Sequence, residues 1–159
     1  MSYFEIQGGH SLKGEIQPQG AKNEALQVIC AVLLTDQEVI IENIPEIRDV
    51  LKLIELLGNL GVKTQRINKG IYSFKADNVD LAFLDSAEFK KQGAALRGSI
   101  MIVGPLLSRF GKGYIPSPGG DKIGRRRLDT HFEGFMSLGA QFEYLPEQNF
   151  YRVHSDNLQ

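Results

Sequence analysis

The sequence is poor in the residues that mark several large classes of protein. Its 159 residues include one cysteine, Cys30, and no tryptophan. A single cysteine excludes an intrachain disulfide and a multi-cysteine zinc site, and is typical of a reducing compartment. His10, His131 and His154 show no metal-ligand spacing, so we expect no metal and no other cofactor. Walker and dinucleotide-binding glycine motifs are also missing, which disfavours nucleotide hydrolysis and nicotinamide chemistry.

Long apolar runs and an excess of charge of one sign are missing too. No stretch approaches the roughly 20 apolar residues of a membrane-spanning helix, and the N-terminus contains no apolar run of signal length. The formal net charge is -1, so the chain as a whole would attract neither nucleic acid nor an anionic membrane. We therefore expect a cytoplasmic protein that meets anions through local clusters of cations.

What is present is an apolar pattern that predicts the same order of elements twice. The first copy is expected to contain a buried helix that Asn23 caps, a strand over 38–41, a helix from about Asp49 to Gly61, and a hairpin turning at 68–70. The second is expected to contain a helix over 96–107, a strand over 113–116, a helix over 127–138, and a hairpin over 141–154. Residues 77–91 are interpreted as a connector. This repeat of roughly eighty residues predicts a mixed α/β domain.

Two short segments are candidate anion-binding sites. Lys22 and Asn23 follow Gly20 at the start of the first helix, where free N–H groups and the helix dipole favour an anion. The alternative is that Asn23 only caps the helix and Lys22 is a solvated surface residue. Arg97 lies among small residues, where a guanidinium would meet either a substrate anion or a carboxylate of the protein.

A basic, glycine-rich loop over 111–127 is the third candidate. It carries Lys122 and three consecutive arginines, Arg125 to Arg127, ahead of a helix, which is a strong local anion site. Its glycines permit the conformations of a mobile lid. The alternative is a solvated charge run on an exposed turn. Asp121 is the only carboxylate within this cationic stretch, and its neighbours favour its ionised form.

Three segments in order resemble the UDP-N-acetylglucosamine enolpyruvyl transferases: QGAKNEAL, AALRGSIMIVGPLLSRFGKG and PGGDKIGRRRLDTH. The resemblance implies an inverted α/β barrel-like lobe, here incomplete, made of repeated helix-strand-helix-hairpin units. The sister family that acts on shikimate 3-phosphate carries Gly-Ser-Lys-Ser where this chain has Gly-Ala-Lys-Asn. That difference disfavours the sister family.

The resemblance also implies an activity and assigns residues to it. The reaction would transfer the enolpyruvyl group of phosphoenolpyruvate to the 3′-hydroxyl of UDP-N-acetylglucosamine and release phosphate, the first committed step of peptidoglycan synthesis. Lys22 and Asn23 would hold phosphoenolpyruvate, and Arg97 would contact the sugar nucleotide. The uridine and diphosphate end would be held by Arg126, Arg127, Leu128, Asp129 and Thr130. Asp121 would be the catalytic proton donor.

The sequence departs from the family pattern in two places, and each departure leads to a prediction. Most members have a cysteine where this chain has Asp121, and a carboxylate is a weaker soft nucleophile than a thiolate, so we expect fosfomycin resistance. The chain also ends after two units, about 22–78 and 92–155, within a partial lobe over 22–159. Residues 1–21 would form a strand segment that packs with a second lobe. We therefore expect an N-terminal fragment that is inactive alone; the alternative is a non-catalytic anion-binding or assembly module.

Overall fold

The computed structural model describes residues 3–116, 128–146, 150–156 and 158, and it confirms the mixed α/β class. The elements of the N-terminal half are α1 (Lys22–Ala31), the 3₁₀ helix η1 (Val32–Leu34), β1 (Glu38–Ile41), α2 (Arg48–Asn59), β2 (Lys63–Asn68) and β3 (Ile71–Lys75). Those of the C-terminal half are η2 (Leu81–Asp85), α3 (Ala87–Ala95), η3 (Arg97–Ile102), α4 (Val103–Phe110), β4 (Lys112–Pro116), α5 (Asp129–Ser137), β5 (Gln141–Leu145) and β6 (Phe150–His154). Among the described helices, none has the length and apolar character needed to cross a membrane.

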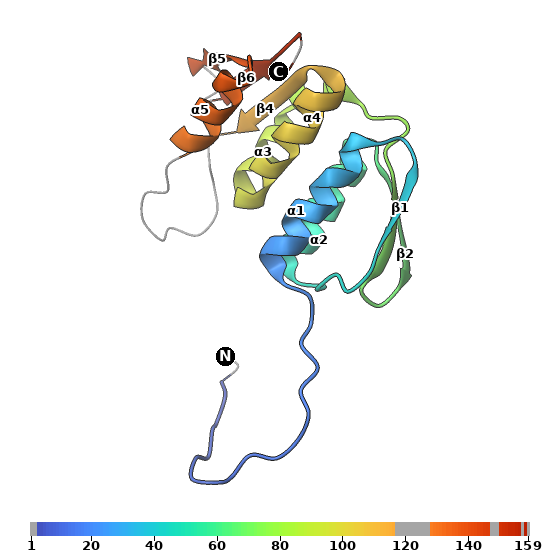
Figure 1. Ribbon diagram of the computed structural model, residues 1–159, viewed down its shortest axis with the longest axis vertical. Coiled ribbons are helices and arrows are strands. Elements are labelled where there is room, and N and C mark those ends of the chain that lie inside the picture. The colour runs from blue at the N-terminus through green and yellow to red at the C-terminus, as the bar shows by residue number, and fades with distance from the viewer. Residues whose placement is uncertain (1–2, 117–127, 147–149, 157, 159) are drawn as a thin grey trace.

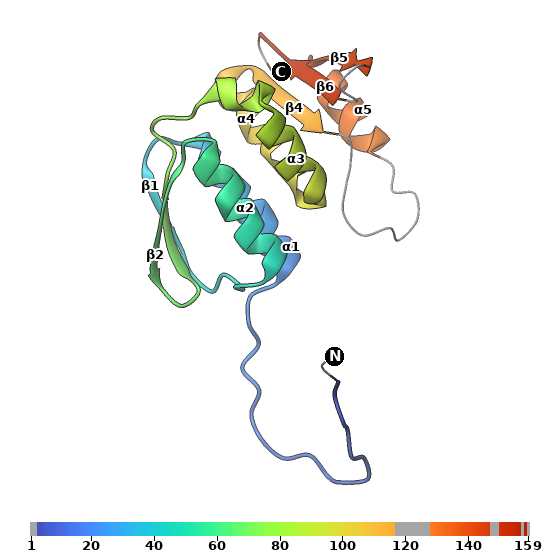
Figure 2. The ribbon, with the colours of Figure 1, turned by 180° about the vertical axis from the view of Figure 1, so that it is seen from behind.

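Two antiparallel three-stranded sheets have the same strand order. β3 lies between β1 and β2, and β6 lies between β4 and β5, so the second strand of each predicted hairpin is central. Helices α1 to α4 lie between the two sheets (Figures 1 and 2). The division of the chain into repeat units and a segment that packs with a second lobe stays a prediction.

The apolar core is shared by the two halves of the chain. Leu53 of α2, Phe74 of β3, Phe89 of α3 and Phe150 of β6 are buried in one continuous cluster. The rings of Phe89 and Phe150 meet edge to face, with centroids 6.3 Å apart. Because burying one such side chain stabilises a fold by roughly 1.5–3 kcal/mol, this cluster fixes the helices of one half against those of the other.

Helix α1 differs from the prediction in two ways. It buries one side only, since Val28 is 44% exposed while Ile29 and Cys30 are buried. Burial raises the pKa of the Cys30 thiol far above its ordinary value, which keeps the sulfur in its unreactive form. The prediction that Asn23 is the N-cap is wrong: Ala21 is the cap residue, and no side chain caps this helix end.

The region over 77–107 also differs from the prediction. The interpretation of 77–91 as a connector is wrong, because η2 and the start of α3 lie in it, and the Ser86 hydroxyl accepts a hydrogen bond from the Phe89 N–H at 3.0 Å. The single helix expected over 96–107 is instead η3 followed by α4. Pro105 explains the break, because proline has no N–H and is tolerated only in the first turn of an α-helix.

Arg109 joins the two halves at the C-terminal end of α4. Its Nη1 atom lies 3.1, 2.9 and 2.8 Å from the backbone oxygens of Leu33, Thr35 and Ala76, to which it donates. These carbonyls belong to the end of η1, the turn before β1 and the residue after β3. A single guanidinium therefore satisfies backbone groups of the N-terminal half that have no strand partner.

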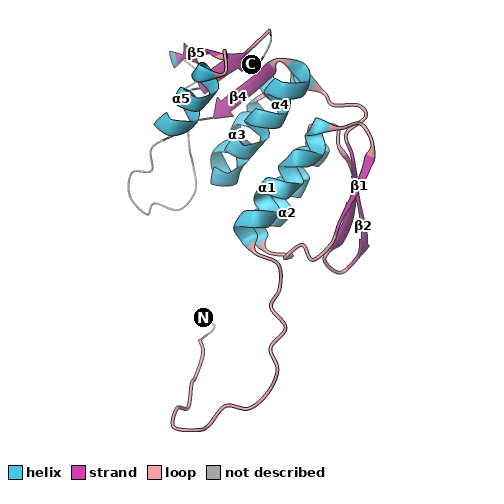
Figure 3. Cartoon of the chain, viewed as in Figure 1, coloured by secondary structure: helices cyan, strands magenta, loops and turns pink. Residues whose placement is uncertain are grey.

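Residues 3–21 contain no helix or strand and extend away from the rest of the chain (Figure 3). Tyr3, Phe4, Ile6, Leu12 and Ile16 are 83 to 98% exposed. The segment meets the folded part at Gly20, whose N–H donates to Asn43 Oδ1 at 3.1 Å.

Glu46 organises the turn that leads into α2. Its carboxylate accepts hydrogen bonds from Arg66 Nε at 2.7 Å, the Gly70 N–H at 3.1 Å and the Tyr72 hydroxyl at 3.0 Å. The bonds from Arg66, then Gly70 and Tyr72, lower the pKa of Glu46 from 4.5 to about 2. The β2–β3 hairpin is thereby tied to the start of α2.

We predict a pH-dependent loss of stability in Glu46→Gln. The unfolded carboxyl protonates near its ordinary value of 4.5, whereas the folded one stays ionised down to about 2. The stabilisation is therefore complete above pH 4.5 and is lost as the pH falls through about 2. Thermal unfolding should show a lower Tm for the variant at pH 7, with a difference that narrows below pH 4.5. Glu55→Gln, on the exposed side of α2, is the control; equal behaviour of the two variants would contradict the prediction.

Candidate functional site

A cleft of about 970 Å³ opens where the first turns of α1 and α2 meet η3 and the start of α5. The residues lining it come from four separate parts of the chain: Lys22, Asn23, Leu26, Gln27, Arg48, Asp49, Lys52, Ala95, Leu96, Arg97, Gly98, Ile100, Met101, Leu128 and His131. In Figures 1 and 2 the N-terminal ends of α1 and α2 lie side by side, close to the C-terminal end of α3. No side chain caps either α1 or α2, so both helices present free N–H groups to this region.

Four of the predicted site residues line this cleft. Helix α1 contributes Lys22 and Asn23, and η3 contributes Arg97. Leu128 is the residue immediately before α5. Asp129 and Thr130 follow in the first turn of α5, but they are not among the lining residues. Asp121, Arg126 and Arg127 lie outside the described residues.

Lys22 is held by a carboxylate. Its Nζ atom lies 3.0 Å from Asp49 Oδ2, and the two side chains are 48% and 44% exposed. An ion pair this exposed contributes little to stability and is readily exchanged for another partner. Asp49 therefore keeps the Lys22 ammonium at the cleft while leaving it available to a ligand.

Arg97 is the half-buried cation that η3 contributes to the cleft. It has neither an ion pair nor a hydrogen bond within the part of the chain that the structure describes, so the structural ion pair offered as its alternative is not seen there. Two contacts place it. Ser99 Oγ donates to the Gly93 oxygen at 2.9 Å, which fixes η3 to α3, and Gly98 lies so close to α1 that a Cβ there would be 3.0 Å from Leu26 Cδ1.

Arg48 and Lys52 also line the cleft, and the sequence reasoning missed both. They lie one turn apart on α2, so their side chains share a face of the helix. The spacing of these two cations by four residues predicts that they share a face of the helix, but it does not indicate which elements that face meets. With Lys22 and Arg97 they make four permanent cations, against the single carboxylate of Asp49. The cleft is thus strongly electropositive.

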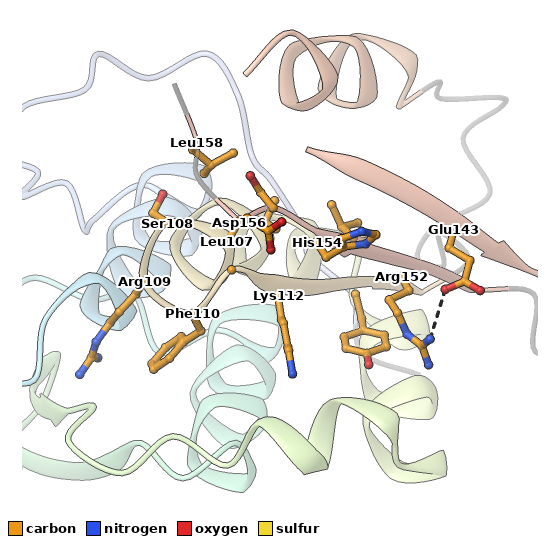
Figure 4. Close-up of a pocket in the computed structure, with 14 residues that line it drawn as sticks. Leu107, Ser108, Arg109, Phe110, Lys112, Glu143, Arg152, His154, Asp156 and Leu158 are labelled. Atoms are coloured by element: carbon orange, nitrogen blue, oxygen red, sulfur yellow. Dashed lines mark hydrogen bonds and ion pairs between the residues drawn. The ribbon is translucent and has the colours of Figure 1, made fainter. Parts of the chain in front are cut away.

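A second cleft, of about 990 Å³, lies between the end of α4 and the edge formed by β4 and β6 (Figure 4). Of its three lysine and arginine side chains, Arg109 and Arg152 are already engaged, and Lys112 is the third. Arg109 donates to the three backbone oxygens given above, and Arg152 Nη1 lies 3.2 Å from Glu143 Oε2. Asp156 adds another negative charge to its lining. Compared with the first cleft, this one has little uncompensated positive charge with which to hold an anion.

A metal site needs several ligating side chains that lie close together. Within residues 3–116, 128–146, 150–156 and 158, no group of three or more histidine, cysteine or acidic side chains could hold a metal ion. His131 lies on the cleft wall.

Comparison with known proteins identifies a family by sequence and a shared fold by structure. The profile of the EPSP synthase (3-phosphoshikimate 1-carboxyvinyltransferase) family matches residues 6–159. A UDP-N-acetylglucosamine 1-carboxyvinyltransferase of Bacteroides thetaiotaomicron is 56% identical over 159 residues, which is all of this chain and 37% of the relative. The enzyme of the same name from Porphyromonas gingivalis is 54% identical over 158 residues, covering 99% of this chain and 36% of the relative. This chain therefore spans about a third of the length of these relatives.

Two solved structures share the fold. The enolpyruvyl transferase NikO from Streptomyces tendae superposes with a TM-score of 0.70 at 21% identity, over 96% of this chain and 32% of that one. EPSP synthase from Acinetobacter baumannii gives a TM-score of 0.53 at 12% identity, over 92% of this chain and 33% of that one. The described elements therefore have the fold of the matching third of these two proteins.

Gly20 is predicted to be required for the geometry at the start of α1. A Cβ at this position would lie 1.9 Å from the backbone oxygen of Asn43, so alanine must displace the segment that leads to Lys22. We expect Gly20→Ala to lower the free energy of unfolding by about 1–3 kcal/mol, as overpacking does. Gly8→Ala, in the same N-terminal segment with nothing within 4 Å, should change it by less than about 0.5 kcal/mol. Urea denaturation that finds the two variants equally stable would disprove this.

Proposed function

The chain belongs to the EPSP synthase family, and we propose that it provides the anion-binding cleft of an enzyme that transfers the enolpyruvyl group of phosphoenolpyruvate to UDP-N-acetylglucosamine. The acceptor would be the 3′-hydroxyl, and phosphate would be released. The names of the relatives at 56% and 54% identity support this choice of acceptor. The enolpyruvyl ether formed would serve peptidoglycan synthesis.

The observation that carries the proposal is the convergence of Lys22, Asn23 and Arg97 on one electropositive cleft. Phosphoenolpyruvate brings a phosphate and a carboxylate, and the sugar nucleotide brings a diphosphate. Both substrates are held in one site, so their mutual repulsion must be offset by fixed cations. A lining with four permanent cations and one carboxylate meets that requirement.

Each residue has a role in this proposal. Lys22 would leave Asp49 for the phosphate of phosphoenolpyruvate, to which Asn23 adds a neutral hydrogen bond. Arg97 of η3 would contact the sugar nucleotide. Leu128 would lie under the uridine end, and Arg126, Arg127, Asp129 and Thr130 would complete that subsite.

The chemistry requires one proton to be delivered to carbon. Protonation of C3 of the enolpyruvyl group makes C2 electrophilic, and the sugar hydroxyl forms its bond to C2 as its proton passes to a base. Loss of a proton from C3 with cleavage of the bond between C2 and the phosphate oxygen then releases phosphate. Asp121 would be the proton donor. A carboxyl group can perform this step when like charge from the substrates and exclusion of water favour its protonated form.

Activity can be tested in a chimaera in which these 159 residues replace the matching part of the Bacteroides thetaiotaomicron relative. We expect phosphate release that depends on both substrates, with a loss of about 100-fold or more in kcat for Asp121→Ala, the range of general acid catalysis. Asp121→Glu should retain part of the activity. An inactive chimaera that still binds both substrates would favour the alternative of a non-catalytic binding module.

The same chimaera tests the expected resistance to fosfomycin. A thiolate opens the epoxide far more readily than a carboxylate does, so the parent should resist inactivation and Asp121→Cys should become sensitive. Rapid covalent labelling of Asp121 itself, seen by mass spectrometry, would overturn this expectation.

A further inference from the structure

Arg48 and Lys52 are the two cations of the cleft that have no role in the proposed reaction. Both line it, and both lie on the face of α2 that continues from the Lys22–Asp49 ion pair. Arg48 is exposed and Lys52 is half-buried. Their positions therefore extend the electropositive surface beyond Lys22, along the first turns of the helix.

Neither side chain is neutralised by the protein in the described structure. Lys22 has Asp49, but Arg48 and Lys52 have no ion pair or hydrogen bond with any described residue. Glu55, one turn beyond Lys52, does not pair with it. Two like charges one turn apart destabilise a helix slightly, and an anion bound from outside would offset this repulsion.

The two side chains differ in a way that suits a phosphoryl group. The Arg48 guanidinium is a planar fork that can donate two parallel hydrogen bonds to phosphate oxygens. The Lys52 ammonium is a compact charge with three donors. Together they match the tetrahedral oxygens of one phosphoryl group better than they match a planar carboxylate alone.

We propose that Arg48 and Lys52 form a second phosphoryl-binding subsite in the cleft, separate from the position of Lys22. This inference rests on the proposed function, because it takes the ligands to be phosphorylated substrates. The phosphoryl group has two sources, phosphoenolpyruvate and the diphosphate of the sugar nucleotide, and binding measurements distinguish them.

The test uses the 159-residue chain and its variants Arg48→Met and Lys52→Met, which keep the apolar stem and remove the charge. Isothermal titration with phosphoenolpyruvate, UDP-N-acetylglucosamine, UDP and uridine would be compared at fixed ionic strength. We expect each variant to weaken binding of one phosphorylated source by about fivefold to tenfold and to leave uridine unaffected. Lys69→Met, on the β2–β3 turn outside both clefts, is the matched control.

The outcomes are distinct. A loss confined to phosphoenolpyruvate, or one shared by UDP and the sugar nucleotide, identifies the source of the phosphoryl group. Affinities within about twofold of the Lys69→Met control for every ligand would overturn the subsite. If the chimaera is inactive while these losses of affinity are seen, the subsite is supported and the proposal of enolpyruvyl transfer fails. If the chimaera is active and the variants bind every ligand as the control does, enolpyruvyl transfer is supported and the subsite fails. Circular dichroism melts check that each variant is folded.

Discussion

The close contact between α1 and η3 is the constraint on which the cleft depends. Gly98 lies so close to the Leu26 side chain that an added Cβ would be 3.0 Å from Leu26 Cδ1, so the segment that carries Arg97 lies directly against the helix that carries Lys22. At the other end of the helices, Arg109 ties α4 to the backbone of the N-terminal half. The shared apolar core lies between these two contacts. The cleft is thus a consequence of how the two halves pack, and neither half contains it alone.

Packing of this kind brings cations together, and the protein leaves most of them uncompensated. In the second cleft, Arg109 donates to backbone carbonyls and Arg152 pairs with a carboxylate of the chain itself. In the first, only Lys22 has an ionic partner among the described residues, and that pair is half exposed. Unpaired charges that face one another raise the energy of the free protein, and an anionic ligand removes this repulsion when it binds. The contrast between the two clefts is the physical reason for assigning function to one of them.

Much of the fold could be predicted from local patterns, because local chemistry determines those parts. The strand over 38–41 and the turn over 68–70 follow from β-branched residues and a glycine with positive φ, Gly70. The segment over 77–107 could not be predicted in the same way. Its structure depends on a cap by Ser86 and on a break before Pro105, and two single residues outweigh the apolar periodicity there.

The residues of the site likewise fall into those that local sequence indicates and those that only tertiary packing brings to the cleft. Lys22, Arg97 and Leu128 were found because each lies in a segment with distinctive local composition or family resemblance. Arg48 and Lys52 lie on an ordinary amphipathic helix, and only the packing of α2 beside α1 and η3 turns them toward the cleft. No pattern within α2 encodes its neighbours. Asp121, on which the proposed chemistry depends, lies outside the described residues, so its role rests on sequence alone.

Binding of phosphorylated substrates where α1, α2, η3 and α5 converge can be tested by titrating the ¹⁵N-labelled chain with UDP-N-acetylglucosamine and then phosphoenolpyruvate, followed through the backbone amide signals. The largest shifts are expected in the segments that line the cleft, 22–27, 48–52, 95–101 and 128–131. Saturation with no shift in these segments, or shifts confined to 107–114 and 152–156 around the second cleft, would contradict it.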